Sequence, residues 1–130
     1  MNRLMEIQFS AFEGDPYHHA LYPGDEYSPA VRAEAGERTI TEWRDDPFIH
    51  FIKCVDRQSG VILGYARWSL FDKERSREQW ANRPPIDWCT GRQKKIAESF
   101  LYASLAMREK TWEGRPHCCK LYYTASTLAG

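Results

Sequence analysis

The chain reads FIHFIKCV from Phe48 to Val55 and VILGYARWSLF from Val61 to Phe71, with DRQSG from Asp56 to Gly60 between the two stretches. Both stretches are apolar on two faces and rich in β-branched and aromatic residues, which is typical of strands. A short polar connection that contains glycine suits a tight reversal of the chain. We therefore predict an antiparallel hairpin at the centre of the fold.

A helix is predicted before this hairpin. Ser28 can accept hydrogen bonds from the first amides of a helix, and Pro29 has no amide of its own to leave unpaired. The helix is expected to run from Pro29 to Arg44 and to stop before Pro47. The preceding residues 14–29 are rich in proline, glycine and aromatic side chains, so we expect an irregular loop there.

The N-terminal segment is predicted to be the first strand. Met5, Ile7, Phe9 and Ala11 alternate with polar residues, which is the period of a strand with one buried face. This alternation also differs from the basic segment and long apolar run of a secretory signal.

The segment after the hairpin has two expected elements. Residues 72–88 are charged and contain prolines, so they predict a connection with one short helical turn at most. Thr90 and Gln93 have the spacing of a capping box and open a predicted amphipathic helix. Its apolar stripe is Ile96, Phe100, Ala103 and Met107 beside Ala97 and Leu101, with Lys95, Glu98 and Tyr102 opposite. A last strand is predicted from His117 to Thr124.

The resulting order is β-α-β-β-α-β in one domain of 130 residues, which predicts an α+β fold with a mainly antiparallel sheet.

Basic and acidic residues number 18 each, so no overall charge attracts nucleic acid. The mean hydropathy of −0.65 argues against a membrane protein. The four cysteines lack CxxC spacing, so we expect no zinc or disulfide framework and a reducing intracellular compartment, the cytoplasm.

Four stretches of the amino-acid sequence resemble one protein family. They are the segment Val55–Phe71, HALYPGD at His19–Asp25, WCTG at Trp88–Gly91 and GRPH at Gly114–His117. Together they are similar to fungal members of the GNAT family of acetyl-CoA-dependent N-acetyltransferases. The resemblance implies a GNAT-like fold over residues 1–130 and transfer of an acetyl group from acetyl-CoA to an amine on a small molecule or peptide.

The chain departs from the family after the last predicted strand. Members continue there into a Q/R-x-x-G-x-G/A turn that holds the cofactor pyrophosphate, whereas this chain reads TASTLAG and ends at Gly130. We therefore expect a truncated member that is catalytically incomplete by itself. The resemblance still implies that Tyr122, Tyr123 and Thr124 line the acetyl-CoA arm.

Aromatic residues are the candidates for a substrate pocket, and the alternative for each is that it packs a loop onto the core. The candidates are Tyr17, His18, His19, Tyr22, Trp68 and Trp88. The two adjacent histidines are expected to be solvated in the loop, with no metal between them.

No catalytic residue is assigned. His50 is expected to be a neutral core histidine. His117 and Cys118 are neighbours on a strand and point to opposite faces, which disfavours a catalytic pair. The basic residues Arg92, Lys94 and Lys95 are expected to form a solvated helix face.

Two other readings of the chain stay open. A non-catalytic protein derived from this family could pair its exposed sheet edge with a second copy, because unpaired strand backbone and apolar surface favour association. A chain without a stable fold is the other alternative, since small cores are marginal.

Overall fold

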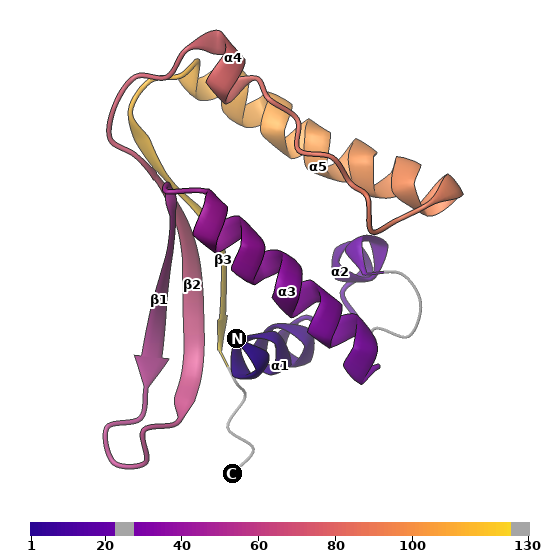
Figure 1. Cartoon of the computed structure of the whole chain (residues 1–130), viewed down its shortest axis with the longest axis vertical. Coiled ribbons are helices and arrows are strands. Elements are labelled where there is room, and N and C mark those ends of the chain that lie inside the picture. Colours follow the sequence, from indigo (N-terminus) through magenta and orange to yellow (C-terminus); the bar gives the residue numbers. More distant parts are fainter. Residues whose placement is uncertain (23–27, 126–130) are drawn as a thin grey trace.

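The computed structural model spans residues 1–130 and describes residues 1–22 and 28–125, with the backbone alone at 121–125 (Figure 1). Helix makes up 51% and strand 18% of the residues whose side chains the structure describes, which confirms a mixture of helix and strand. The elements are α1 (Asn2–Ala11), α2 (Pro16–Leu21), α3 (Pro29–Asp45), β1 (Ile49–Val55), β2 (Ile62–Phe71), α4 (Arg77–Trp80), α5 (Gly91–Trp112) and β3 (His117–Ala125).

The described strands form one antiparallel sheet in the order β1-β2-β3. Ile49 pairs with Ser69 in the hairpin, which confirms the predicted hairpin to within a residue at each end. β3 begins at His117, as predicted for the last strand, and pairs antiparallel with β2 from Phe71 onward. The register of this second pairing shifts between Arg67 and Trp68.

The predicted first strand is wrong, because residues 2–11 form helix α1. Met5, Gln8 and Phe9 are buried and lie three and four positions apart, so they share one face of the helix. Ile7 is buried as well, and the wide buried face of this helix produces the alternation that resembles a strand. The order β-α-β-β-α-β is therefore also wrong at its first element.

Part of the predicted irregular loop is helical, since residues 16–21 form α2. The carboxylate of Asp15 accepts hydrogen bonds from the amides of Tyr17 at 2.8 Å and His18 at 3.0 Å. Pro16 occupies the first turn, where its missing amide leaves no donor unpaired. These two local effects start a helix where composition alone favoured a loop.

The predicted helix α3 is confirmed and ends one residue later than expected. The Ser28 hydroxyl accepts from the amide of Ala30 at 3.2 Å. Gly36 faces α1, and a Cβ at this position would lie 3.4 Å from Cγ of Met5. The absence of a side chain at Gly36 therefore lets α1 and α3 pack closely.

The long helix α5 is confirmed, but its predicted buried face is not. Ala97 is completely buried, whereas Ile96 is 43% and Met107 is 71% exposed. The side chain of Thr90 makes no cap hydrogen bond, and Gln93 instead donates to the carbonyl of Ala20 at 2.6 Å. Packing of Ala97 on Ile86 and Cys89 thus turns Ile96, Ala103 and Met107 toward solvent, while Phe100 stacks on Tyr17 of α2.

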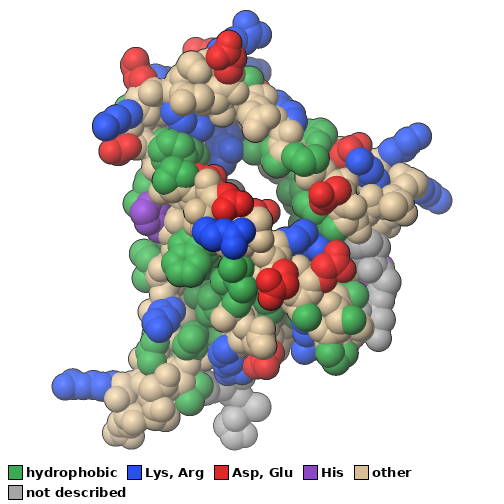
Figure 2. Space-filling view, in the orientation of Figure 1, with side chains coloured by type: hydrophobic (Ala, Val, Ile, Leu, Met, Phe, Trp, Pro, Cys, Tyr) green, Lys and Arg blue, Asp and Glu red, His purple; other side chains and the backbone are tan. Residues whose placement is uncertain are grey.

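The described helices lie on one side of the sheet, and α5 stands away from it across the molecule (Figure 1). One core cluster joins α1 to α3 through Met5, Phe9 and Ala35. A second joins α5 to the preceding segment through Ile86, Cys89 and Ala97. Figure 2 shows a hollow between α5 and the part of the molecule that holds α3.

Candidate functional site

An aromatic cluster of Phe9, Phe12, His18 and Tyr22 lies where α1 meets α2. The His18 ring centre lies 4.8 Å from that of Phe9, 5.5 Å from that of Phe12 and 4.6 Å from that of Tyr22. His18 is only 7% exposed, so the prediction that it is a solvated loop histidine is wrong. Its helix turns the ring inward onto α1, whereas His19 is exposed.

A chain of hydrogen bonds connects this aromatic cluster to the sheet. The hydroxyl of Tyr65 donates to Oε1 of Gln8 at 2.7 Å, and Nε2 of Gln8 donates to the hydroxyl of Tyr22 at 3.1 Å. Tyr65 and Gln8 are both buried. The buried amide therefore fixes the position of the Tyr22 hydroxyl relative to β2.

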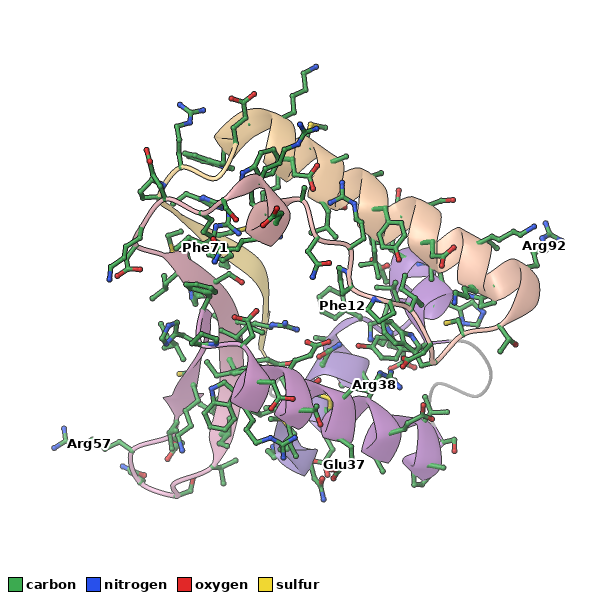
Figure 3. The ribbon with its side chains drawn as sticks, turned by 45° about the horizontal axis from the view of Figure 1, so that its top comes forward. Phe12, Glu37, Arg38, Arg57, Phe71 and Arg92 are labelled. Atoms are coloured by element: carbon green, nitrogen blue, oxygen red, sulfur yellow. The ribbon has the colours of Figure 1, made fainter. Side chains whose placement is uncertain are left out.

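Arg38 of α3 connects the aromatic cluster to Trp88 (Figure 3). Its guanidinium carbon lies 6.0 Å from the ring centre of Tyr22 and 4.7 Å from that of Trp88. The Trp88 indole donates to the carbonyl of Leu21 at 3.0 Å, which holds the ring beside the end of α2. His18, Tyr22 and Trp88 of the predicted pocket therefore lie in one region.

Tyr17 and Trp68 do not join this region, so their placement in the predicted pocket is wrong. Tyr17 is 61% exposed and stacks on Phe100 of α5 with ring centres 5.0 Å apart. Trp68 alternates with the buried Ser69 along β2, so it lies on the opposite sheet face, in register with His50.

A shallow groove along α5 lies apart from the aromatic cluster. This groove of about 920 Å³ follows the outer face of α5 and includes Tyr17, Ile96 and Phe100. None of His18, Tyr22, Trp68 and Trp88 lines it. This groove is therefore distinct from the region of His18, Tyr22 and Trp88, where the His18 ring packs against Phe9 and Phe12.

The backbone of β3 forms an edge of the sheet within the described part of the chain. Tyr122 pairs with Arg67, Tyr123 with Ala66 and Thr124 with Tyr65. The side chains of these three predicted cofactor residues lie outside the described part. Since Arg67 pairs with Tyr122 and Trp68 with Lys120, one residue of β3 is extra at the register shift.

The remaining reactive side chains are dispersed. His50 is exposed, so the expectation of a core histidine is wrong, because β1 is an edge strand with one uncovered face. His117 is buried and Cys118 exposed, as alternation on a strand predicts.

Burial raises the pKa of the Cys89 thiol, which keeps it protonated and a poor nucleophile. In residues 1–22 and 28–125, no three metal-binding side chains come together.

Gln8 and Arg38 were missed by the sequence analysis, although both organise this region. Gln8 carries a weak signal, since it is a polar residue three and four positions from Met5 and Leu4 in an apolar segment. Arg38 carries none, because many exposed helix positions in this chain are charged.

Comparisons with models of known protein families, with curated proteins and with solved structures gave no match. Among the described helices, none combines the length and apolar character needed to cross a bilayer.

Proposed function

We propose that the chain is a domain of the acetyl-CoA-dependent N-acetyltransferase class, which binds the acetyl-CoA arm along the edge of β3. The observation that carries the proposal is the position of residues 122–124 on an edge strand beside a register shift. The family resemblance of the segment Val55–Phe71 and of the stretch before His117 supports it.

The edge of β3 fits an extended ligand that contains amides. Alternate backbone N–H and C=O groups of an edge strand point away from the sheet and can pair with an added extended chain. The arm of acetyl-CoA is such a chain, and when bound it supplies an activated acetyl thioester. A backbone amide at residues 122–124 would donate to the oxyanion that forms when an amine attacks the thioester carbonyl.

The acceptor amine, on a small molecule or peptide, would be selected by groups near this edge. We propose the hydroxyl of Tyr22 and the ring of Trp88, both partly exposed, for this role, with the buried His18 positioning Tyr22. Tyr65 pairs with Thr124 and bonds to Gln8, so the polar chain to Tyr22 begins directly beside the predicted cofactor segment.

Thermal unfolding with acetyl-CoA tests this proposal. A ligand that binds only the folded state raises the midpoint, and at ten times its dissociation constant it adds about 1.4 kcal/mol, or roughly 4 °C for a domain of this size. We expect a saturable rise with acetyl-CoA and none with acetate. Amine-dependent release of free thiol then measures turnover, whereas an unchanged midpoint contradicts the proposal.

A non-catalytic association function is the second candidate, because one sheet face and edge are exposed. Ile52 and Leu70 are 62% and 41% exposed on that face, and Val55 is 39% exposed on the edge strand β1. Large exposed apolar side chains on a strand edge favour pairing with a second copy.

Sedimentation at increasing concentration tests the second candidate. We expect a dimer that is weakened by Ile52→Lys and preserved in Met107→Lys, which places the same charge on a 71% exposed residue of α5. A monomer at every concentration, or equal effects of the two substitutions, contradicts association through the sheet.

A further inference from the structure

Two arginines approach the same phenyl ring at the end of β2. The guanidinium carbon of Arg75 lies 3.6 Å from the ring centre of Phe71, and that of Arg108 lies 5.9 Å from it. Arg75 follows the hairpin and Arg108 belongs to α5, so residues far apart in the sequence meet here. Both arginines line one small cavity of about 10 Å³ with Trp80, Glu109, Trp112, Glu113 and Gly114.

Neither Arg75 nor Arg108 forms an ion pair within the described part of the chain, although Glu109 and Glu113 also line the cavity. Glu109 is held through both carboxylate oxygens by Arg83. The charge of Asp46 attracts Arg75. Burial first, and then the charge of Arg108, lower the pKa of Arg75. Arg75 and Arg108 therefore repel each other at this cavity, and an added anion between them would offset that repulsion.

Further polar atoms at this place have no partner among the described residues. Nε of Arg75 is buried and makes no hydrogen bond. His117 is 9% exposed, with its ring centre 4.8 Å from that of Phe71 and stacked on Trp112. Its Nδ1 donates to the carbonyl of Arg115 at 2.7 Å, and its Nε2 is buried without a partner. Buried polar atoms are normally hydrogen-bonded, so unpaired ones beside two cations indicate a ligand.

We propose that Arg75 and Arg108 bind a phosphate group over Phe71, with His117 as a third contact. Guanidinium groups match the geometry of phosphate oxygens and donate to two of them at once. The cavity has room for about one water-sized atom, so one phosphate oxygen enters it while the others remain at its mouth. Because Nδ1 of His117 donates to the Arg115 carbonyl, its Nε2 accepts from a protonated phosphate oxygen.

Thermal unfolding in phosphate and in chloride at equal ionic strength tests this site. We expect inorganic phosphate to raise the midpoint saturably, by roughly 4 °C at ten times its dissociation constant. Arg108→Gln is expected to abolish this rise, whatever its own midpoint in chloride, because it removes one of the two guanidinium groups that hold the phosphate. Arg108→Lys keeps the charge but not the paired donors, so it should retain only part of the rise.

Arg57→Gln and Arg92→Gln are the matched controls. Figure 3 shows Arg57 at the tip of the hairpin and Arg92 at the far end of α5 from Phe71. Both should keep the full response to phosphate. The proposal is overturned if phosphate has no saturable effect, or if Arg108→Gln responds as the controls do.

Glycerol phosphate in the same assay identifies the source of the phosphate group. An equal response to inorganic phosphate and to the ester assigns the site to the phosphate group itself, and a stronger response to the ester assigns it to a phosphorylated organic molecule. Both results support the site. Because the assay contains no acetyl-CoA, its failure is independent of the proposed acetyltransferase activity.

Discussion

The hydroxyl of Tyr65 in β2 donates a buried hydrogen bond to Oε1 of Gln8 in α1, with the two oxygens 2.7 Å apart. Tyr65 is 2% exposed and Gln8 is 5% exposed. The same amide donates onward to Tyr22, so both ends of the Gln8 side chain are satisfied. A polar contact therefore fixes α1 on the sheet at the point where the aromatic cluster begins.

Tyr65→Phe is expected to destabilise the protein by about 1–3 kcal/mol, because it leaves the buried Oε1 of Gln8 without a donor. Urea unfolding measures the change as a lower midpoint with an unchanged slope. Tyr17→Phe removes the same hydroxyl from a 61% exposed ring and should leave the midpoint unaltered. Equal midpoints for the two variants would show that the Gln8 contact contributes nothing to stability.

The parts of the fold that follow local rules could be predicted from the sequence. The hairpin has apolar strands on either side of a polar turn, and Asp56 accepts from the amides of Gln58 and Ser59 in that turn. These hydrogen bonds lower the pKa of Asp56, and the bond from the Ser59 amide has the largest effect. Ser28 and Pro29 likewise determine where α3 begins, whatever surrounds it.

The errors arose where tertiary contacts decide the outcome. Alternation in the first segment cannot distinguish a strand from a short helix whose buried face includes both Ile7 and Gln8. For α5, the apolar stripe gave a correct helix but not its orientation, because Ala97 packs on Ile86 and Cys89 from a segment without regular pattern. His18 was misplaced since its burial depends on α1, which the sequence had assigned to a strand.

Asp15→Ala is expected to destabilise the protein by about 1 kcal/mol, because the Asp15 carboxylate caps the six-residue helix α2 with two hydrogen bonds. The midpoint of thermal unfolding should fall by a few degrees. Asp45→Ala is the control, since Asp45 lies in the last turn of α3, where a negative charge is unfavourable to the helix dipole. A fall of the same size in both variants would contradict a capping role for Asp15.

The ion pair of Arg83 with Glu109 predicts a loss of stability in acid. Hydrogen bonding from Arg83 lowers the pKa of Glu109 below its ordinary value near 4.5. The pair therefore contributes its full stabilisation above that value and loses it as the pH falls through the lower pKa of the folded state. The free energy of unfolding, measured from pH 7 to pH 3, should decline less steeply in Glu109→Gln than in the unmodified protein.

Glu37→Gln, at an exposed carboxylate of α3, serves as the control for this titration. It should retain the steep decline. If Glu109→Gln declines as steeply as Glu37→Gln does, the pair does not account for the acid sensitivity.

Gly114→Ala is expected to be more damaging than Gly60→Ala, although both glycines have left-handed φ angles of 79° and 73°. Alanine in this conformation costs about 1 kcal/mol at either position. A Cβ at Gly60 meets nothing within 4 Å, whereas one at Gly114 would lie 2.5 Å from the carbonyl oxygen of Arg75 and from Cδ1 of Trp80. Relieving this overlap should cost a further 1–3 kcal/mol or so.

Urea unfolding of the two glycine variants separates the shared backbone strain from the steric overlap. The Arg75 amide also donates to the carbonyl of Gly114 at 3.0 Å, so the overlap falls where the end of α5 is tied to the segment after the hairpin. Because the displaced backbone carries Arg75, Gly114→Ala should also weaken the response to phosphate, and Gly60→Ala should leave it intact. Equal destabilisation by both substitutions would show that the packing of Trp80 and Arg75 against Gly114 is looser than the structure describes.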